Sequence, residues 1–402
     1  RAILFSFKTI GQINMHNDKK KTIAVIFGGQ SAEHDVSIIT AHIPIIQSLL
    51  AMDQFDVVPI YIAKDGAWYS DDAMNDLAYF KQPDFVEHTR RGKKLQLFFD
   101  NGFKVIRPGF FSKTISVDVV FPAMHGTSGE DGSLMGLLRM AGVPFVGCDL
   151  FASAVAMDKT LTKQVIAAEG ISVVPYVWFT KYDWERNTSE WMEEIRKLRW
   201  PLFVKPVHLG SSIAITKVKD EAALGNAVEV ALHYDDKVLV EESVENLIEV
   251  TLPIIGNEDL QCAAIERPLN KTEFFDFSDK YLSGGKKGSG VNSAYSEIPA
   301  NIAPDLAREV EKLGKKVYRT LGCSGIARVD FLIDGTKNKV FVNEVNTLPG
   351  SLYHHNWKTI GESNIELVGR LVELAEERFE SARKLTRTFD SDILGKVGGG
   401  KL

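Results

Sequence analysis

Apolar residues in the first third of the chain form short runs that alternate with amphipathic stretches. The run 22–27 (TIAVIF) is β-branched and aromatic and ends at two glycines, which is typical of a buried strand entering a tight turn. A helix is predicted next, over 34–52. Further predicted elements are strands over 55–62, 117–121 and 143–147 and a helix over 131–140. Alternating strands and helices predict a parallel α/β domain, which we end at Cys148.

The pattern after residue 148 predicts a small mixed unit followed by a longer one. Predicted helices cover 151–157, 159–169, 190–198, 220–233, 305–321 and 365–379. Predicted strands cover 174–179, 202–205, 214–218, 237–242, 248–255, 326–333 and 339–345. We interpret the polar stretch 181–188 as a loop.

Composition narrows the class of protein. The chain has 402 residues, 45% of them hydrophobic and 25% charged, which is an ordinary globular balance and predicts two or three domains. A formal net charge of −6 gives no general attraction to nucleic acid or to an anionic membrane. An anionic substrate therefore needs a local basic site.

Cysteine usage and the chain ends predict a cytoplasmic protein. Cys148, Cys262 and Cys323 are odd in number and widely spaced, which favours reduced thiols over a disulfide framework. The first residues have no signal-peptide pattern, and no apolar run is long enough to span a bilayer. Met15 precedes a charged stretch, so we interpret residues 1–14 as an upstream extension. The glycine-rich end predicts a flexible tail.

The most informative segment is a predicted hairpin over 327–346. Period two places Arg328 and Asp330 on one face of the first strand, and Glu344 and Asn346 on one face of the second. If the hairpin is symmetric about Lys337, Asp330 lies opposite Glu344 and Arg328 opposite Asn346. Two facing carboxylates repel, and a divalent cation removes that penalty. Oxygen donors of this kind suit Mg²⁺, although a solvated hairpin face is the simpler alternative.

Eight short motifs follow one another along the chain: GGQSAEHDVS (28–37), HGTSGEDG (125–132), AMDK (156–159), FVKP (203–206), GSS (210–212), DKYLS (279–283), RVDF (328–331) and NEVNTLPG (343–350). In this order they resemble the motifs of the D-alanine–D-alanine ligase family within the ATP-grasp superfamily. Any one of them could arise by chance, but eight in this order could not. The resemblance extends over about residues 22–378.

The resemblance implies an N-terminal Rossmann-like parallel α/β domain followed by a two-subdomain ATP-grasp fold that holds ATP between two sheets. The implied boundaries are an extension (1–21), the N-terminal domain (22–148), a central subdomain (149–236), a C-terminal subdomain (237–385) and a tail (386–402). The implied reaction joins two D-alanines for peptidoglycan precursor synthesis, through an acyl phosphate formed from ATP. A cytoplasmic homodimer with Mg²⁺ or Mn²⁺, as two ions, is also implied.

The resemblance also implies roles for single residues. Lys159 and Lys205 match the lysines that bind the ATP phosphates, and the Ser211-Ser212 turn offers backbone N–H groups and hydroxyls to phosphate. The remaining implied roles fall into three groups. Implied ATP contacts are Glu241, Lys280 and Asn343; implied metal ligands are Asp330, Glu344 and Asn346; implied substrate or catalytic residues are Glu33, His125, Ser211, Tyr281, Arg328 and Gly350.

Tyr281 has a structural role in this scheme. By resemblance it hydrogen-bonds with Ser211 and Glu33 while Lys280 reaches the γ-phosphate, which closes the site and excludes water from the acyl phosphate. In the family, Glu33 binds the ammonium group of the first D-alanine. A Lys-Tyr pair at this position accompanies D-alanine rather than D-lactate as the second substrate.

Four features depart from the family pattern. Ala214 stands where relatives usually have glycine, the segment 283–292 is longer and richer in glycine than usual, and SLYHHNW (351–357) replaces a segment that contacts the second substrate. The fourth is Leu247, which simple alignment puts at the position of the glutamate that binds the ATP ribose. Glu245 and Glu249 are the candidate substitutes.

Three alternatives remain open at this stage. One is a ligase that joins D-alanine to another acceptor, such as D-serine, D-lactate or a different amino acid. The second is a non-catalytic nucleotide-binding regulator on the same scaffold, which the Leu247 substitution would suit. A dinucleotide-binding dehydrogenase rests only on the strand and double glycine at the start, because no G-x-G-x-x-G motif is present.

Overall fold

The computed structural model describes residues 20–100, 102–109, 112–269, 296–391 and 393. Predictions for the N-terminal extension (except its last two residues), for Lys280 and Tyr281, for the glycine-rich segment 283–292 and for most of the tail concern residues outside these ranges.

The first sheet is the predicted parallel one. Its strands are β1 (Lys21–Gly28), β2 (Phe55–Ile62), β3 (Trp68–Tyr69) and β7 (Val119–Pro122), in the order β3-β2-β1-β7. Strand β1 pairs in parallel with both β2 and β7, and β3 adds an antiparallel edge. The predicted helix over 34–52 is a continuous helical segment made of α1 (His34–Thr40), the π-helical η1 (Ala41–Ile46) and α2 (Gln47–Leu50).

Other parts of this region differ from the prediction. The strand expected over 143–147 is wrong, because only Phe145 makes an isolated bridge, to Val120. A three-stranded antiparallel sheet of β4 (Gln96–Phe99), β5 (Phe103–Arg107) and β6 (Lys113–Val117) had no predicted counterpart. The helical elements are η2 (Asp72–Asn75), α3 (Leu77–Phe80), α4 (Phe85–Arg91) and α5 (Ser133–Ala141).

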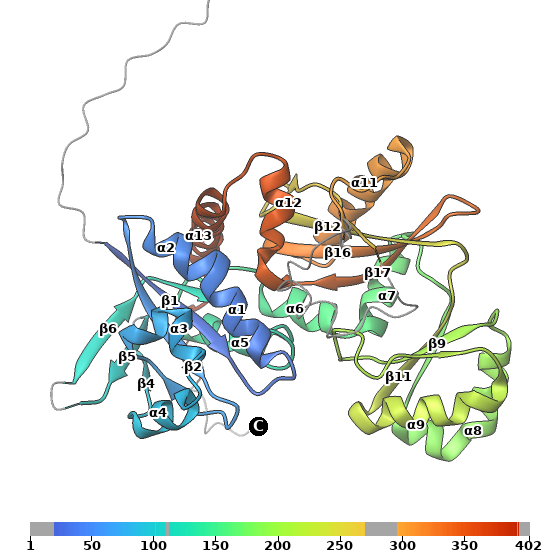
Figure 1. The fold of residues 1–402 in the computed structure, drawn as a ribbon, viewed down its shortest axis with the longest axis horizontal. Helices are drawn as coiled ribbons and strands as arrows, with labels where there is room; N and C mark the ends of the chain where they lie inside the picture. The colour runs from blue at the N-terminus through green and yellow to red at the C-terminus, as the bar shows by residue number, and fades with distance from the viewer. Residues whose placement is uncertain (1–19, 101, 110–111, 270–295, 392, 394–402) are drawn as a thin grey trace, which may run out of the picture.

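A second sheet, entirely antiparallel, has the order β10-β9-β11-β8. Its elements are β8 (Tyr176–Thr180), α8 (Lys181–Arg196), β9 (Leu202–Pro206), β10 (Thr216–Val218), η3 (Glu221–Ala223), α9 (Leu224–Tyr234) and β11 (Lys237–Glu242). Helices α8 and α9 cover one face, and apolar side chains from both pack with the strands in one core (Figure 1).

The loop predicted over 181–188 is wrong, because α8 begins there. Thr180 caps the helix in a reciprocal capping box with Asp183. Trp184 and Trp191 lie on one apolar face of α8 and pack against Phe179. Their ring centroids are 5.0 and 5.4 Å from the centroid of the Phe179 ring. The polar composition of the segment hid this spacing of seven residues, which marks one face of a helix.

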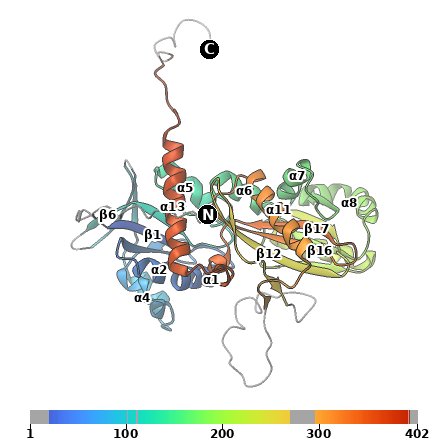
Figure 2. The ribbon, with the colours of Figure 1, turned by 90° about the horizontal axis from the view of Figure 1, so that it is seen from above.

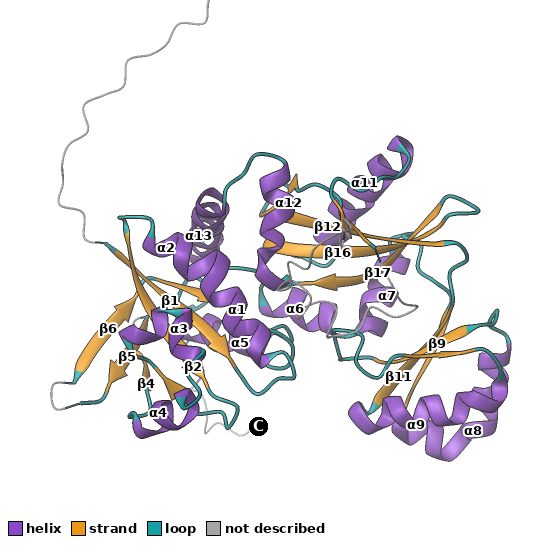
Figure 3. Cartoon of the chain, viewed as in Figure 1, coloured by secondary structure: helices purple, strands orange, loops and turns teal. Residues whose placement is uncertain are grey.

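The third sheet carries the predicted acidic hairpin. Its strands are β12 (Leu247–Gly256), β13 (Gln261–Cys262), β16 (Gly325–Asp334) and β17 (Lys339–Asn346), in the order β13-β12-β16-β17. Helices α6 (Leu150–Met157), α7 (Lys159–Ala168) and α11 (Pro304–Thr320) share its core. Strands β14 (Arg267–Pro268) and β15 (Ser296–Glu297) pair separately. Figure 3 shows this sheet and the second one facing each other beside α7.

The last helix returns to the first sheet. After η5 (Gly350–Tyr353) and α12 (His354–Thr359), α13 (Asn364–Arg383) runs beside β1 and α2 (Figures 1 and 2). Leu367, Leu371 and Leu374 are buried in the same core as Ile23 and Phe27 of β1. The domain boundaries implied by resemblance stay a prediction. No helix within the described ranges is long and apolar enough to cross a membrane.

Candidate active site

The two strands of the acidic hairpin pair as predicted at their polar end. Asp330 lies opposite Glu344 and Arg328 opposite Asn346. The assumed symmetry about Lys337 fails beyond that point, because the register shifts by one residue between Asp330 and Phe331. Asn343, an implied ATP contact, is the extra residue of this β-bulge and is half-buried.

The bulge lets β17 present valines to the core on one face and Glu344 on the other. With strict alternation, Val342 and Glu344 would point to the same face of the strand. With one extra residue between them, Val342 and Val345 are both buried in the core, while Glu344 is half-buried on the opposite face. The three valines at 340, 342 and 345 break period two, and this was the sequence signal for the bulge.

Arg328 holds Asp330 by a bidentate contact. Its Nε donates to Oδ1 at 2.7 Å and its Nη2 to Oδ2 at 2.5 Å. The guanidinium also lies 4.8 Å from the ring centroid of Tyr353, in the segment that departs from the family pattern. Burial disfavours the charged guanidinium, but Asp330 and Tyr353 outweigh burial and raise the pKa of Arg328. A positively charged guanidinium group, held by its contact with Asp330, therefore lies beside the paired carboxylates.

Lysines from the neighbouring elements approach the same carboxylates. Lys159, the first residue of α7, has its Nζ 3.7 Å from Glu344 Oε2. Lys205, from β9, donates to Glu241 Oε1 of β11. Burial disfavours the charged Lys205, but Glu241 outweighs burial and, together with Glu344 and Glu249, raises the pKa of Lys205. The two implied phosphate lysines are therefore brought to one side of the hairpin.

A third lysine beside this cluster, Lys163, was not singled out in the sequence. Lys163 of α7 is 1% exposed, and its Nζ lies 2.9 Å from Glu241 Oε2. Burial disfavours ionisation of Glu241, but Lys163 and Lys205 outweigh burial and lower the pKa of Glu241 to about 2. Burial lowers the pKa of Lys163 although Glu241 acts in the opposite direction, whereas the pKa of Lys205 is raised, so Lys205 is the cation that this cluster offers to a phosphate ligand. The available signal was Lys163 standing one helical turn after Lys159.

Glu33 and Ser211 meet although 178 residues separate them. Glu33 precedes α1 and is 9% exposed, and Ser211 Oγ donates to its Oε1. Ser211 and Ser212 have φ of 55° and 58°, and Ala214 has φ of 57°, so all three adopt the left-handed conformation. Relatives with glycine in place of Ala214 would adopt that conformation without strain.

His125 is connected to the altered segment through Thr40. His125 Nε2 lies 2.9 Å from Thr40 Oγ1, which also accepts a hydrogen bond from Ser351 N at 3.0 Å. Gly350, an implied substrate contact, begins η5 immediately before that amide. Burial lowers the pKa of His125, so its ring is neutral near pH 7.

Asn346, the third proposed oxygen donor, makes a local hydrogen bond, because its Oδ1 accepts from Leu348 N at 3.1 Å.

Glu130 is a second residue that sequence reasoning missed. It lies within the motif 125–132 but had no assigned role, and its Oε2 accepts from Gly126 N at 2.7 Å. Burial and the nearby charge of Glu33 raise the pKa of Glu130 to about 8. A carboxyl group that is protonated near pH 7 thus lies close to Glu33, Arg328 and Glu344.

The structure distinguishes the candidate ribose glutamates. Leu247 is 40% exposed at the start of β12, and Glu245 pairs with Arg199 at 2.6 Å. Glu249 lies opposite Leu332, on the same sheet face as Thr251 and Asp330, and its charge contributes to the raised pKa of Lys205. Glu249 is therefore the carboxylate directed toward the lysines.

The oxygen donors fit a hard divalent cation. Asp330 and Glu344 face each other across the ladder, and Asn346 adds an amide side chain on the same face of β17. Carboxylate and amide oxygens are suitable ligands for Mg²⁺ or Mn²⁺. Arg328 and Lys159 already provide part of the positive charge that these carboxylates need.

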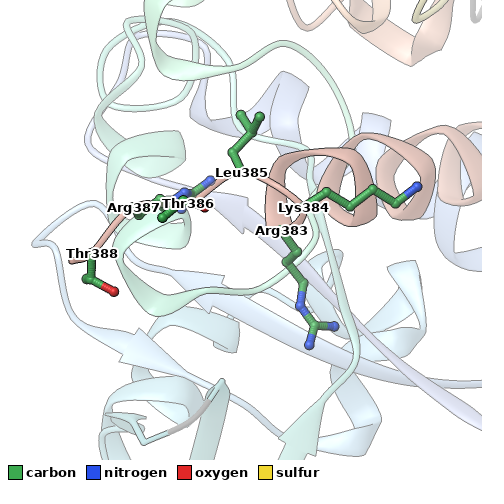
Figure 4. Close-up of a pocket in the computed structure, with 6 residues that line it drawn as sticks. All are labelled: Arg383, Lys384, Leu385, Thr386, Arg387 and Thr388. Carbon is green, nitrogen blue, oxygen red and sulfur yellow. The ribbon is translucent and has the colours of Figure 1, made fainter. Parts of the chain in front are cut away.

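A hollow of about 460 Å³ lies elsewhere, at the end of α13 (Figure 4). It is lined by Arg383, Lys384, Leu385, Thr386, Arg387 and Thr388. None of these is a predicted site residue, and the lining offers no carboxylate and no buried polar group. The side-chain cluster around the hairpin, not this hollow, is the candidate active site.

Comparison with known families gives two matches. The family described as D-ala D-ala ligase N-terminus matches residues 22–148, and the family described as D-ala D-ala ligase C-terminus matches residues 165–373. The D-alanine–D-alanine ligase of Thermosipho melanesiensis is 36% identical over 380 residues, covering 94% of this chain and 99% of the relative. D-alanine–D-alanine ligase A of Escherichia coli K12 is 35% identical over 375 residues, covering 92% and 100%.

Solved structures resemble the fold as well. The VanG D-Ala:D-Ser ligase from Enterococcus faecalis superposes with a TM-score of 0.74 at 32% identity, covering 89% of this chain and all of the other. The D-alanine–D-alanine ligase from Coxiella burnetii also gives 0.74, at 29% identity, covering 91% and 97%.

Proposed function

The chain belongs to the D-alanine–D-alanine ligase family, and from this membership we propose that it joins two D-alanines at the expense of ATP. The carboxylate of the first D-alanine takes the γ-phosphoryl group and releases ADP. The amine of the second then attacks the acyl phosphate, forms the peptide bond and releases phosphate. The product would serve peptidoglycan precursor synthesis in the cytoplasm. A homodimer is part of the same proposal.

One observation carries the proposal: cationic and acidic side chains from three separate elements converge on one face of the hairpin. Lys159 approaches Glu344, and Arg328 grips Asp330. Phosphoryl transfer needs neutralisation and positioning of phosphate charge more than it needs a protein nucleophile. A regulator that only bound nucleotide would not need Arg328 buried beside the paired acids.

We assign the metal to Asp330, Glu344 and Asn346. Mg²⁺ or Mn²⁺ bound there, as two ions, would neutralise charge on the ATP phosphates. Lys159 and Lys205 would bind phosphate oxygens, and the Ser211-Ser212 turn would contribute backbone N–H groups. Asn343 would contact ATP beside the metal ligands.

The remaining roles concern the substrates. Glu33 would bind the ammonium group of the first D-alanine, with Ser211 Oγ fixing the carboxylate that does so. Arg328 would bind the substrate carboxylate or the transferring phosphate. His125 and Gly350 would line the same site. Glu241 would contact the adenine side and Glu249 the ribose. Lys280 and Tyr281 would close the site, as the family resemblance implies.

The acceptor is the least constrained part of the proposal, because Ser351 to Trp357 replace the family's usual segment. The similarity to a D-Ala:D-Ser ligase structure makes D-serine a specific second candidate. We expect phosphate release with ATP, Mg²⁺ and D-alanine alone. At a low D-alanine concentration, adding D-serine or D-lactate should raise phosphate release less than adding the same amount of D-alanine. Product analysis by mass spectrometry identifies the dipeptide.

Two results would contradict the proposal. If D-alanyl-D-alanine does not form while a mixed product does, the acceptor assignment is wrong. If the protein binds ATP but releases no phosphate with any acceptor in the panel, the regulator alternative replaces the ligase.

A further inference from the structure

His208 connects the segment that includes Ser211 to two neighbouring elements. We name residues 207–214 the phosphate loop; it follows directly after β9. His208 Nδ1 lies 2.9 Å from Asp235 Oδ1, and its backbone N–H donates to Asp235 Oδ2 at 2.6 Å. Its Nε2 lies 3.4 Å from Asp158 Oδ2. Asp235 is the C-cap of α9, and Asp158 is the N-cap of α7.

Asp158 contacts His208 and also caps the helix that begins with Lys159. Its Oδ1 accepts from Thr160 N at 2.8 Å and from Leu161 N at 2.9 Å, which fixes the first turn of α7. Its Oδ2 also accepts from Lys237 Nζ at 2.8 Å. Lys159, the next residue, donates from Nζ to Leu209 O at 2.6 Å and from its backbone N to Val207 O at 3.4 Å, so several contacts join the start of α7 to the phosphate loop.

The phosphate loop needs such ties because its backbone is strained. Ser211, Ser212 and Ala214 all hold left-handed φ values without being glycine. Such conformations persist only where the surroundings enforce them. Ser211, the first of the strained residues, donates from Oγ to Glu33. His208 ties the part of the loop that precedes the strained residues to Asp235.

His208 is a cation in this setting. Hydrogen bonds to Asp158 and Asp235 raise the pKa of His208 to about 9. The charged groups around it are those two acids, Asp236 beside Asp235, and Lys237 and Lys159 on either side of Asp158. Donor atoms of His208, Asp235 and Asp236 lie within 4.8 Å of one another, but both ring nitrogens already face carboxylates, so neither offers a lone pair to a metal ion.

We propose that His208 is a positioning residue for the ATP phosphates: its imidazolium, between Asp158 and Asp235, holds the phosphate loop and the start of α7 in one geometry. This inference rests on the proposed function, since it concerns the ATP site of that reaction. His208 itself does not contact the nucleotide. Its effect reaches ATP through Lys159 and the Ser211-Ser212 turn.

The experiment compares His208→Gln, His208→Arg and the control His233→Gln, which alters an exposed histidine in the last turn of α9. Steady-state kinetics give KM for ATP and for D-alanine separately, and calorimetry gives Kd for Mg²⁺-ADP. We expect His208→Gln to raise KM for ATP and Kd for Mg²⁺-ADP about tenfold, the effect of one lost charge-assisted hydrogen bond. KM for D-alanine should change less than about twofold.

Charge dependence separates positioning from a general loss of structure. His208→Arg, which keeps the positive charge, should recover most of the nucleotide affinity. In the wild type, Kd for Mg²⁺-ADP should rise as pH increases through about 9, because deprotonation of His208 breaks the tie, and this rise should be smaller in His208→Arg. His233→Gln should match the wild type throughout.

Equal nucleotide affinity in His208→Gln and the wild type overturns the inference, and so does a loss in His208→Gln that falls equally on ATP and D-alanine. A pH dependence that is identical in the wild type and His208→Arg overturns it as well. Failure of the proposed function is distinguishable, because the wild type would then release no phosphate while Mg²⁺-ADP binding still tests His208.

Discussion

The acidic hairpin and the phosphate loop form two sides of the candidate active site but are held in different ways. Val329, Phe331 and Val342 anchor the hairpin in a buried core, and its acids lie on the opposite face. The phosphate loop keeps three strained residues in place through polar contacts of His208, Lys159 and Glu33. Hydrophobic burial is insensitive to pH and charge, whereas polar ties are not. Substitutions should therefore separate chemistry at the hairpin from binding geometry at the loop.

The largest effect is expected at the hairpin acids. Asp330→Asn and Glu344→Gln keep the size of the side chain but remove charge from the proposed metal ligands. In Asp330→Asn only one of the two hydrogen bonds that Arg328 donates can be kept. We expect phosphate release to fall by about 10³-fold or more, with an unchanged circular dichroism spectrum. Wild-type rates in both variants would show that the metal assignment is wrong.

The next effect tests the buried charges behind the phosphate lysines. Lys163→Met removes one of two cations from Glu241, a carboxylate that is 1% exposed. We expect the free energy of unfolding in urea to fall by about 2 kcal/mol, because the buried Glu241 then keeps only Lys205 as a cationic partner. The double variant Lys163→Met with Glu241→Gln should recover part of that loss. A midpoint equal to that of the wild type in the single variant would contradict this account.

Glu130 provides a pH test between the two regions. Its native pKa of about 8 is above the ordinary value of 4.5, so between these pH values the native state holds a proton that the unfolded chain has released. The contribution of Glu130 to stability is complete below about pH 4.5 and is lost as pH rises toward 8. The free energy of unfolding, measured in urea from pH 5 to 8, should therefore decline more steeply with pH in the wild type than in Glu130→Gln. Parallel pH profiles would contradict the shift.

The smallest effect concerns strain in the phosphate loop. Ala214→Gly removes a Cβ at φ of 57° and should raise the free energy of unfolding by about 0.5 kcal/mol, since relief of left-handed strain exceeds the entropy gained by the unfolded chain. Ala307→Gly, within α11, should have the opposite sign and cost about 1 kcal/mol. Equal losses in both variants would argue against strain at Ala214.

The sequence predicted what short-range patterns determine. The strands over 22–27, 55–62 and 237–242 and the facing of Asp330 and Glu344 were predicted from periodicity, and the observed elements confirm them. The family and its ligase class came from ordered motifs. The hairpin bulge was missed because strict alternation was assumed, and the start of α8 was missed because charged residues outnumber the two tryptophans that face the core.

Contacts between distant segments were beyond such reasoning. Lys163 and His208 belong to none of the motifs, and Glu130 lies within one but had no assigned role. Each acquires its chemistry from partners that only the fold supplies. The resemblance implied that Tyr281 contacts both Ser211 and Glu33, but the direct hydrogen bond between Ser211 and Glu33 was not predicted. Composition and periodicity describe a residue's neighbours along the chain, whereas a shifted pKa depends on neighbours in space.

The place of α13 has a consequence for biosynthesis. Its leucines complete the core around β1, yet they are translated more than 330 residues after that strand. The helices α1, η1 and α2 cover part of that core, but the rest of this apolar side of the first sheet emerges from the ribosome uncovered and stays so until α13 arrives. A nascent chain of this protein should depend on chaperones at its beginning rather than at its end, and premature termination before residue 364 should yield an aggregating product rather than a smaller folded one.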